Sequence, residues 1–418
     1  MIIFNLDAKP QCDDLRVCND YSARIIKNAI AIPLIKINSI NGLIEGGLCN
    51  LSTSKTKKTI LYVNEFYFSN GQKLLPLHIK NHITWIIKKS TKYKFMLEDL
   101  KKIKTKKNMI IFYHRKNINF KFLLTDINFS PFLNKDISCG NFCIRDIKLN
   151  YLIVESNKYN NKHKKTIMFN FIYNNYEDVK MFEEGTTDFT NPTTFPVELI
   201  NNSRNSLHIH ENNILLSISF MNRKLLNNEY LNLRKMIFYS INRELITSKF
   251  NPMLTPIYNF KDKEKTKIDN SAITKNESNI KLVMGYDNFY PNKEISLIIK
   301  EMLEKNNIKL ELIETNFYNR DETVDLQLNL TYRDYNHKSF YYLSKYFELL
   351  TKLSSPFDYK KIQKLKYKYL KKGDDQSFDQ LTKTIDKLYV EIPLFIENAI
   401  FLSKYNNFNF NSFNFQDL

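Results

Sequence analysis

The stretch ILLSISF, residues 214–220, is where the pattern of the chain changes. Its apolar residues follow one another closely between polar flanks, which is typical of a strand that is buried on both faces. Residues 229–248 come next, with Leu233, Ile237 and Leu245 spaced as on one face of an amphipathic helix. The sequence therefore predicts a buried strand followed by a packed helix, which is the start of an α/β unit.

Downstream of this unit the same alternation continues. We expect a strand at 281–284, a helix at 292–306 and a strand at 308–313, an order that implies a parallel pair of strands. Residues 324–330 form a third expected strand, and helices are expected to fill 338–388. These segments together predict a second lobe that begins near residue 214.

Upstream, the pattern predicts a β-rich region with few helices. A helix at 20–32 would place Ile25, Ile26, Ala29 and Ile30 on one face. At the far end of the chain, Pro393 is expected to break the pattern before 394–402 returns to the first lobe. The remaining expected elements are a helix at 76–88 and strands at 2–6, 60–63, 109–112, 143–154 and 166–171.

The net charge of 62 − 44 = +18 has two explanations. One is an acidic partner, such as nucleic acid or an anionic membrane surface. The other is an AT-rich genome, which enriches Lys, Asn, Ile, Tyr and Phe and leaves only 8 glycines in 418 residues. We favour the second explanation because the basic residues are scattered, with only short clusters at 101–107 and 360–372. We therefore expect no nucleic-acid partner.

Cysteines and histidines give no sign of a metal site. There are five cysteines, and Cys139 and Cys143 are three residues apart without a second pair or a nearby His. We expect all five to be unpaired small hydrophobic residues. His78 and His82 share a helix face, but no third ligand is visible. We expect no metal and no cofactor.

Sequence motifs of catalysis and of targeting are also missing. The chain lacks G-x-x-x-x-G-K-S/T, H-E-x-x-H and G-x-S-x-G, so we expect no catalytic residues and no enzyme activity. No run of 18 apolar residues predicts a membrane span. Residues 1–6 do not form a secretory signal, so either a signal was removed or the protein stays inside the cell. Arg234 and Arg243 are expected either to hold the helix 229–248 or to lie on its solvated face.

Several short segments, taken in order, resemble the peptide and nickel branch of the solute-binding proteins that serve ABC importers, known as family 5. Gly46, Gly47, Gly71, Gly140 and Gly185 all fall in these segments, although glycine is rare in this chain. Asn141 and Asn242 depart from the family, which has Pro and Asp there. The matching segments are 44–48 (yeGL), 68–72 (FsdG), 138–142 (GTGPY), 155–159 (erNpdYw), 184–188 (GevD), 220–222 (fN), 233–246 (vRqA…aiDReaI), 333–336 (aDYnep) and 392–395 (iPLy).

The resemblance implies an α/β, two-lobed periplasmic-binding-protein-like fold (type II, cluster C) with an extra subdomain on the first lobe. The first lobe would take 1–38, 140–212 and 388–418. The extra subdomain would take 39–139, and the second lobe 213–387. Only the strand at 214–220 and the return at 387–394 would then link the two lobes covalently.

The resemblance further implies a substrate-binding protein of an ABC importer that captures a peptide or other small solute by hinge closure. Its partners would be that ligand and the ABC transporter permease, and we expect a monomer in an extracytoplasmic location, periplasmic or membrane-tethered. The alternative is an intracellular ligand sensor or a biosynthesis-associated binding protein with the same fold. No helix-turn-helix module precedes residue 1, which disfavours direct binding of DNA.

The candidate ligand residue with the clearest reason is Asp334. It follows the expected strand 324–330, and ligands of open α/β lobes bind outside the carboxyl ends of strands. By resemblance, this Asp would hold the α-ammonium of a peptide, with Tyr332, Tyr335 and Asn336 beside it. A turn Asp that caps the next helix, or that pairs with Arg333, is the competing interpretation. The other candidate is Asn222, at the end of the strand 214–220.

Overall fold

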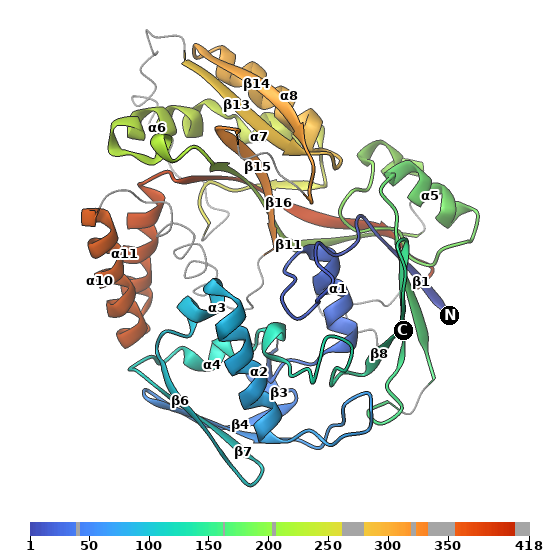
Figure 1. The fold of residues 1–418 in the computed structure, drawn as a ribbon. Helices are drawn as coiled ribbons and strands as arrows, with labels where there is room; N and C mark the ends of the chain where they lie inside the picture. Colours follow the sequence, from blue (N-terminus) through green and yellow to red (C-terminus); the bar gives the residue numbers. More distant parts are fainter. Residues whose placement is uncertain are drawn as a thin grey trace.

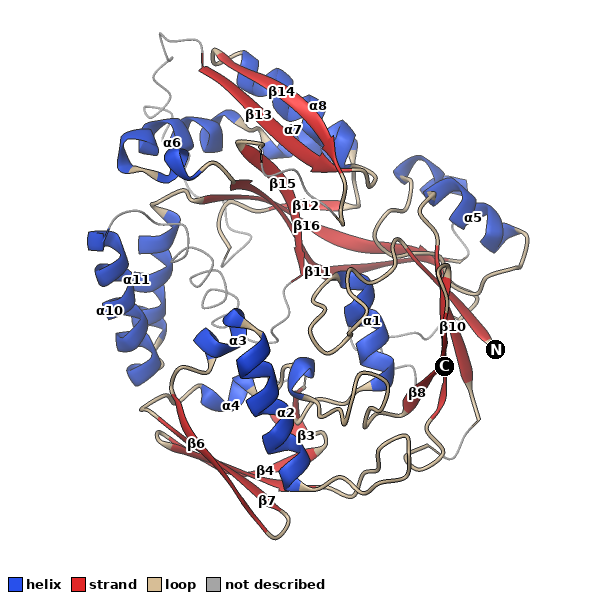
Figure 2. Cartoon of the chain, in the orientation of Figure 1, coloured by secondary structure: helices blue, strands red, loops and turns tan. Residues whose placement is uncertain are grey.

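The computed structural model describes residues 1–38, 42–161, 164–202, 206–260, 280–318, 323–332 and 356–405. It is an α/β molecule with a sheet in a first lobe, a sheet in an extra subdomain and a larger sheet in a second lobe (Figure 1). Figure 2 shows the helices packed around these sheets. No helix within the described ranges is both long enough and apolar enough to cross a membrane.

The first-lobe sheet has the strand order β1-β10-β9-β8. β1 pairs in parallel with β10, while β10, β9 and β8 are antiparallel. The helix α1 (Tyr21–Ile30) packs against this sheet and buries Ile25, Ile26, Ala29 and Ile30, as predicted. The strands are β1 (Ile2–Leu6), β8 (Phe142–Ile147), β9 (Tyr151–Ser156) and β10 (Thr166–Phe171), and a second helix is α5 (Asn175–Glu183).

The prediction of one strand over 143–154 was wrong. The chain forms a hairpin of β8 and β9 there, and Lys148 N–H donates to the carbonyl of Tyr151 at the turn. The alternation of apolar residues continues through both arms, because Ile144 and Val154 pair across the hairpin. The turn contains no Gly or Pro, so the sequence gave no signal for it.

The extra subdomain has a four-stranded antiparallel sheet with the order β4-β5-β7-β6. Gly140, at the junction with the first lobe, lies so close to α1 that a Cβ would be 2.2 Å from the carbonyl carbon of Ile30. The predicted need for glycine in that segment is thereby explained. The elements are β2 (Ile35–Ile37), β3 (Ile44–Gly46), β4 (Cys49–Lys55), β5 (Lys58–Val63), α2 (Pro76–Lys89), α3 (Thr91–Met96), β6 (Leu100–Lys106), β7 (Met109–His114), α4 (Phe120–Leu123) and η1 (Ile127–Phe129).

The second-lobe sheet has the order β12-β16-β11-β15-β13-β14. The strands β13, β14 and β15 are parallel, and α8 connects the first two of them, as the β-α-β pattern predicted. Their bounds are β13 (Ile280–Asp287), α8 (Asn292–Glu304), β14 (Ile308–Thr315) and β15 (Leu326–Tyr332). The other elements are η2 (Val197–Asn202), η3 (Arg223–Leu226), η4 (Asn228–Tyr230), β12 (Leu254–Pro256), α10 (Pro356–Lys372) and α11 (Asp375–Asp386).

The prediction of one continuous helix over 229–248 was also wrong. The structure has two helices, α6 (Leu231–Ser240) and α7 (Arg243–Lys249), separated at Asn242. The Asn242 side chain accepts a hydrogen bond of 3.1 Å from Leu245 N–H and so caps α7. The break redirects the second half, and Leu245 is 48 % exposed instead of buried.

Two strands cross between the lobes, β11 (Leu207–Phe220) and β16 (Glu391–Leu402), and they pair antiparallel in both lobes. The register shifts between His210 and Ile214. Pro393, which was expected to break the pattern, lies inside β16 beside a second register shift. A bulge accommodates the missing N–H of proline, which is why the strand continues. The lobe boundaries remain predictions, although β2 and β3 pair across the boundary proposed at residue 38.

Arg243 ties α6 to the crossing strand β16. Its side chain is 1 % exposed and donates to the carbonyl of Pro393 from Nε (3.1 Å) and Nη2 (2.8 Å). Nη1 donates to the carbonyls of Phe238 and Ile241 at the end of α6, and the guanidinium lies over the Phe238 and Tyr258 rings. The predicted structural role is confirmed, through capped carbonyl groups.

Arg234 is buried as well and acts in the same way on the other side of α6. Its Nε donates to the carbonyl of Leu388 at 2.9 Å, and its Nη1 donates to the carbonyls of Leu225 and Asn227. Both arginines therefore hold the chain that enters β16 against the helix that follows β11.

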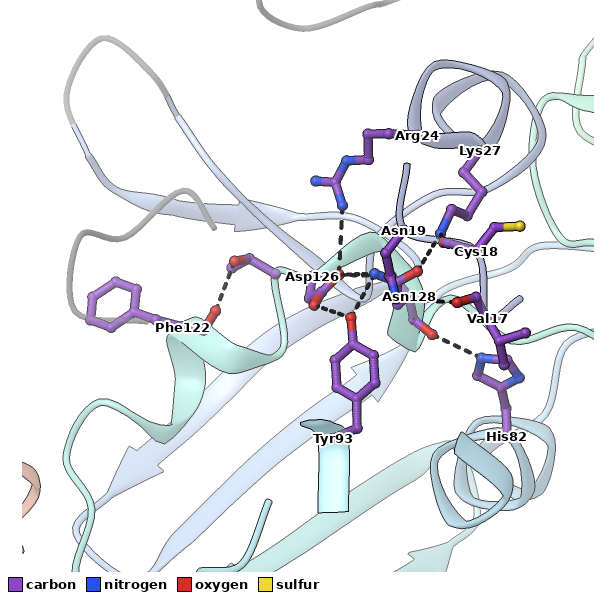
Figure 3. Close-up of polar contacts among 11 residues, drawn as sticks. Val17, Cys18, Asn19, Arg24, Lys27, His82, Tyr93, Phe122, Asp126 and Asn128 are labelled. Atoms are coloured by element: carbon purple, nitrogen blue, oxygen red, sulfur yellow. Dashed lines mark hydrogen bonds and ion pairs between the residues drawn. The ribbon is translucent and has the colours of Figure 1, made fainter. Parts of the chain in front are cut away.

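A buried polar network joins α1 to the extra subdomain (Figure 3). Lys27 donates to the Asn128 side chain at 2.5 Å and to the carbonyl of Cys18. The hydroxyl of Tyr93 donates to Asp126 at 2.8 Å, and His82 Nε2 bonds to the carbonyl of Asn128 at 2.9 Å. Burial of these groups without partners would be costly, so the network fixes the extra subdomain to the first lobe.

The helix pair α10–α11 reaches from the second lobe to the extra subdomain. Lys366 is buried, forms an ion pair with Glu98 and lies 3.9 Å from the centre of the Phe95 ring. Asn119 donates to the hydroxyl of Tyr369 at 3.0 Å. The second lobe thus contacts the extra subdomain at one edge.

The expectation that all five cysteines are unpaired was wrong. Cys12 and Cys18 form a disulfide bond in the loop between β1 and α1, whereas Cys49, Cys139 and Cys143 are free. The short separation of six residues made the pair compatible with a tight loop, but spacing alone does not identify a disulfide partner.

We expect Arg243→Lys to lower the free energy of unfolding by about 2–4 kcal/mol, because a lysine cannot bond to all three carbonyls at once. Urea unfolding measures this change. The matched control is Arg223→Lys on the exposed start of η3, which we expect to be nearly neutral. A larger loss of ligand affinity than of stability would contradict the structural role.

Burial lowers the pKa of His82 to about 4. An unfolded chain, with the ordinary value near 6.5, binds a proton that the folded protein rejects, so this site stabilises the fold above pH 6.5. That contribution, about 3 kcal/mol, is lost as the pH falls from about 6.5 to about 4. In His82→Gln, which keeps a donor for Asn128, we expect unfolding energies to depend less on pH in this window. Equal slopes for both proteins would refute the assignment.

Candidate ligand-binding site

The two lobes face each other with the carboxyl ends of their strands. In the first lobe, β1 ends beside Asp7 and β10 ends just before Tyr173. In the second lobe, β13 ends at Asp287 and β14 at Thr315. Ligands of open α/β sheets bind outside such ends, so this junction is the candidate site.

Hydrogen bonds join the lobes at one edge of the junction. Gln11 Nε2 donates to the carbonyl of Phe317 at 2.9 Å, and the Tyr318 hydroxyl donates to the carbonyl of Lys9 at 2.9 Å. The hydroxyls of Tyr173 and Tyr318 are 3.2 Å apart. The loops after β1 and β10 are therefore in contact with the loop after β14, as in a closed arrangement.

Tyr290 makes a further set of bonds between the lobes. Its hydroxyl accepts from Val197 N–H at 3.3 Å and donates to Glu198 at 3.4 Å. Tyr290 follows β13, and Val197 begins the 3-10 helix η2, which belongs to the predicted first lobe. The closed arrangement is thus held by two separate loops of the second lobe.

Carboxylates collect at the first-lobe side of the junction. Asp7 accepts from the hydroxyls of Thr193 (2.6 Å) and Ser22 (3.1 Å), and Asp20 caps α1 by accepting from Ala23 N–H (2.9 Å). Burial raises the pKa of Asp7, and the negative charge of Asp20 raises it further. Burial also raises the pKa of Asp20. This side of the junction favours a positively charged group.

Glu397 belongs to the same acidic group although it comes from the crossing strand β16. Its side chain is 3 % exposed. Burial raises its pKa well above the usual range, and the charge of Asp7 adds to the effect. Glu397 lies one residue from the register shift between the lobes, because it pairs with Ile214.

Of the predicted ligand residues, Tyr332 is the last residue of β15 and pairs with Ile214. Ile214 also pairs with Glu397 on its other side, so the backbones of Tyr332 and Glu397 lie two strand spacings apart, about 10 Å. The predicted residues Asp334, Tyr335 and Asn336 lie outside the described residues. The predicted segment therefore begins in the same row of the sheet as Glu397.

Asn222 lies at the other end of β15. Its side chain donates to Asp325 at 2.8 Å and accepts from Lys224 N–H at 3.1 Å, which caps η3. Phe220 pairs with Leu326 and Ile214 with Tyr332, so about 20 Å of strand separates the two ends. The structure does not bring Asn222 together with Tyr332, and its contacts are those of a structural cap.

Sequence reasoning missed Asp7 and Glu397. Asp7 directly follows the predicted strand 2–6, so the rule that selected Asp334 applies to it equally well. Glu397 is the one charged residue in the apolar run 392–402, and a charged residue in a buried strand is unusual. Both signals were present in the sequence. No three His, Cys, Asp or Glu side chains of the described residues are arranged to hold a metal ion.

Comparison with solved structures identifies the fold. OppA of Haemophilus influenzae in complex with the peptide RPPGFSPFR is 17 % identical, with a TM-score of 0.81 over 96 % of this chain and 94 % of that one. The murein tripeptide binding protein MppA of Escherichia coli is 13 % identical, with a TM-score of 0.82 over the same shares. This chain has the fold of the family 5 solute-binding proteins. NikA of Staphylococcus aureus, in complex with Ni(L-His)2, matches at 15 % identity and a TM-score of 0.81 over 98 % and 96 %.

The arrangement of the lobes differs from that of an open relative. Against MppA in its unliganded open form, the TM-score falls to 0.65. The family 5 chain described here is therefore arranged more like the first form of MppA than like the open one, in agreement with the bonds between its lobes. No protein-family model and no curated protein sequence matches this chain.

We expect Tyr318→Phe to favour the open arrangement by about 1 kcal/mol, because the loop after β14 loses its bonds to Lys9 and Tyr173. Small-angle scattering of the ligand-free protein should show a larger radius of gyration. The control is Tyr62→Phe on the exposed surface of the extra subdomain. An unchanged radius in Tyr318→Phe would contradict a role for these bonds in holding the lobes together.

Proposed function

We propose that this protein captures a peptide or another small organic solute between its lobes and delivers it to the permease of an ABC importer. The observation that carries the proposal is the facing of strand ends from two lobes that are linked by the crossing strands β11 and β16. A hinge of this kind buries a ligand on closure, and burial strengthens its polar contacts.

The fold relatives support a solute-binding role over catalysis. OppA is in complex with a peptide, MppA is a murein tripeptide binding protein, and NikA is in complex with Ni(L-His)2. These ligands share small size and polar ends but differ in chemistry. A peptide is the first candidate because amino-acid groups are present in all three.

An extracytoplasmic location, periplasmic or membrane-tethered, is part of the proposal. Disulfide bonds persist mainly in oxidising compartments, and Cys12–Cys18 closes the loop that leads to Asp20. The relatives OppA and MppA do not by themselves fix the location of this chain. The location is tested by cell fractionation of the organism that produces the protein.

Asp334 is the proposed ligand of a peptide's α-ammonium group, with Tyr332, Tyr335 and Asn336 beside it. The support is the row that joins Tyr332, Ile214 and Glu397, which brings the start of this segment to the lobe junction. A carboxylate suits an ammonium because a charge-assisted hydrogen bond is strong where little water is present.

We expect Asp334→Asn to weaken binding of a peptide with a free amino terminus by about 10²-fold, and binding of its acetylated form much less. Calorimetry measures both affinities. Asp136→Asn, on an exposed loop of the extra subdomain, is the matched control and should leave both unchanged. Equal affinities for Asp334→Asn and the unaltered protein would remove Asp334 from the site.

A further inference from the structure

Glu397 is a buried carboxyl group for which the structure provides no donor. Its side chain is 97 % buried, and no hydrogen bond or ion pair joins it to any other residue in the part of the chain that the structure describes. Buried carboxylates are normally paired, and leaving one unpaired costs several kcal/mol. The neighbouring Asn398, by contrast, is satisfied by a bond from its Nδ2 to the carbonyl of Pro252.

The direction of the Glu397 side chain follows from the strand. Residues 397, 399 and 401 alternate onto one face of β16, and Ala399 and Phe401 pack in the first-lobe core with Phe4 and Leu6. Leu6 is the last residue of β1, and Asp7 comes directly after it. Glu397 is therefore on the face that carries Asp7, which agrees with the electrostatic interaction between the two carboxyl groups.

Asp7 is only partly satisfied by the residues around it. The hydroxyls of Ser22 and Thr193 are neutral donors, and its side chain retains some exposure. Asp7 is the single charged group that acts on Glu397 among the described residues. Two facing carboxyls repel each other when both are ionised, and a cation between them removes that repulsion.

We propose that the ligand carries an ammonium or guanidinium group that Asp7 and Glu397 hold between them; this inference rests on the proposed solute-binding function. An organic cation fits better than a metal ion, because the described carboxylates do not converge as a set of three metal ligands. Such a cation lies at the point where β11 and β16 shift register, so its binding favours the closed arrangement. The site is distinct from Asp334, and a ligand that uses both carries two positive charges.

The test uses three tripeptides that differ at the central residue: Ala-Lys-Ala, the same peptide with ε-acetyl-lysine, and Ala-Glu-Ala. We expect the full chain to bind the lysine peptide at least about tenfold more tightly than the acetylated one, by calorimetry. In Glu397→Gln, which is uncharged and of similar size, this preference should fall to about threefold or less. Asp7→Asn should have the same effect, so the result does not depend on the folding of one variant.

Asp386→Asn is the matched control. Asp386 lies at the end of α11, and burial raises its pKa to about 7, as it does for other buried carboxyls, but Asp386 does not act on Asp7 or Glu397. This variant should keep the tenfold preference. Free lysine, measured alongside, separates the two sources of the cation: binding of free lysine assigns the site to small amines, and binding of Ala-Lys-Ala alone assigns it to basic peptides.

The outcomes separate this inference from the proposed function. Binding of all three tripeptides with equal affinity overturns the cation site and leaves peptide capture intact. A preference for lysine that persists in both Glu397→Gln and Asp7→Asn overturns the assignment to these residues. Failure of free lysine and of every tripeptide to bind at millimolar concentration overturns peptide capture itself, and the inference with it.

Discussion

The antiparallel pairing of β11 with β16 is the constraint on which the rest of the structure depends. The two strands cross between the lobes together, so each lobe inherits one strand pair of fixed register. The register shift between His210 and Ile214 is the place where the pair can bend without losing its ladder. Arg243 holds β16 to α6 just beyond this point, which makes the second lobe rigid up to the hinge.

The attachments around the hinge divide the molecule into parts that move together. Lys27 and Asn128 fix the extra subdomain to α1, so this subdomain belongs mechanically to the first lobe. The second lobe then touches the first-lobe side at two edges, through Tyr318 near Lys9 and through Lys366 at Glu98. Opening must break both sets of contacts, and each is polar and small enough to be reversible.

The charge of the molecule and the charge of its junction have opposite signs. The chain as a whole carries +18, whereas the junction holds Asp7, Asp20 and Glu397. The basic residues are scattered over the sequence, in keeping with a compositional origin. Three buried acidic residues in one place are harder to explain by composition, because burial of a carboxyl is costly unless a partner or a ligand compensates for it.

The sequence by itself determined the order of the elements, the parallel unit of the second lobe and the two crossing segments, because these depend on the periodicity of apolar residues within short windows. It failed where a local break leaves that periodicity intact, as in the hairpin within 143–154 and the cap at Asn242. Only the tertiary structure decided that Cys12 bonds to Cys18, that Asn222 lies far from Tyr332, and that Glu397 faces Asp7. These are relations between distant residues, and they arise from strand register and packing, which no local pattern records.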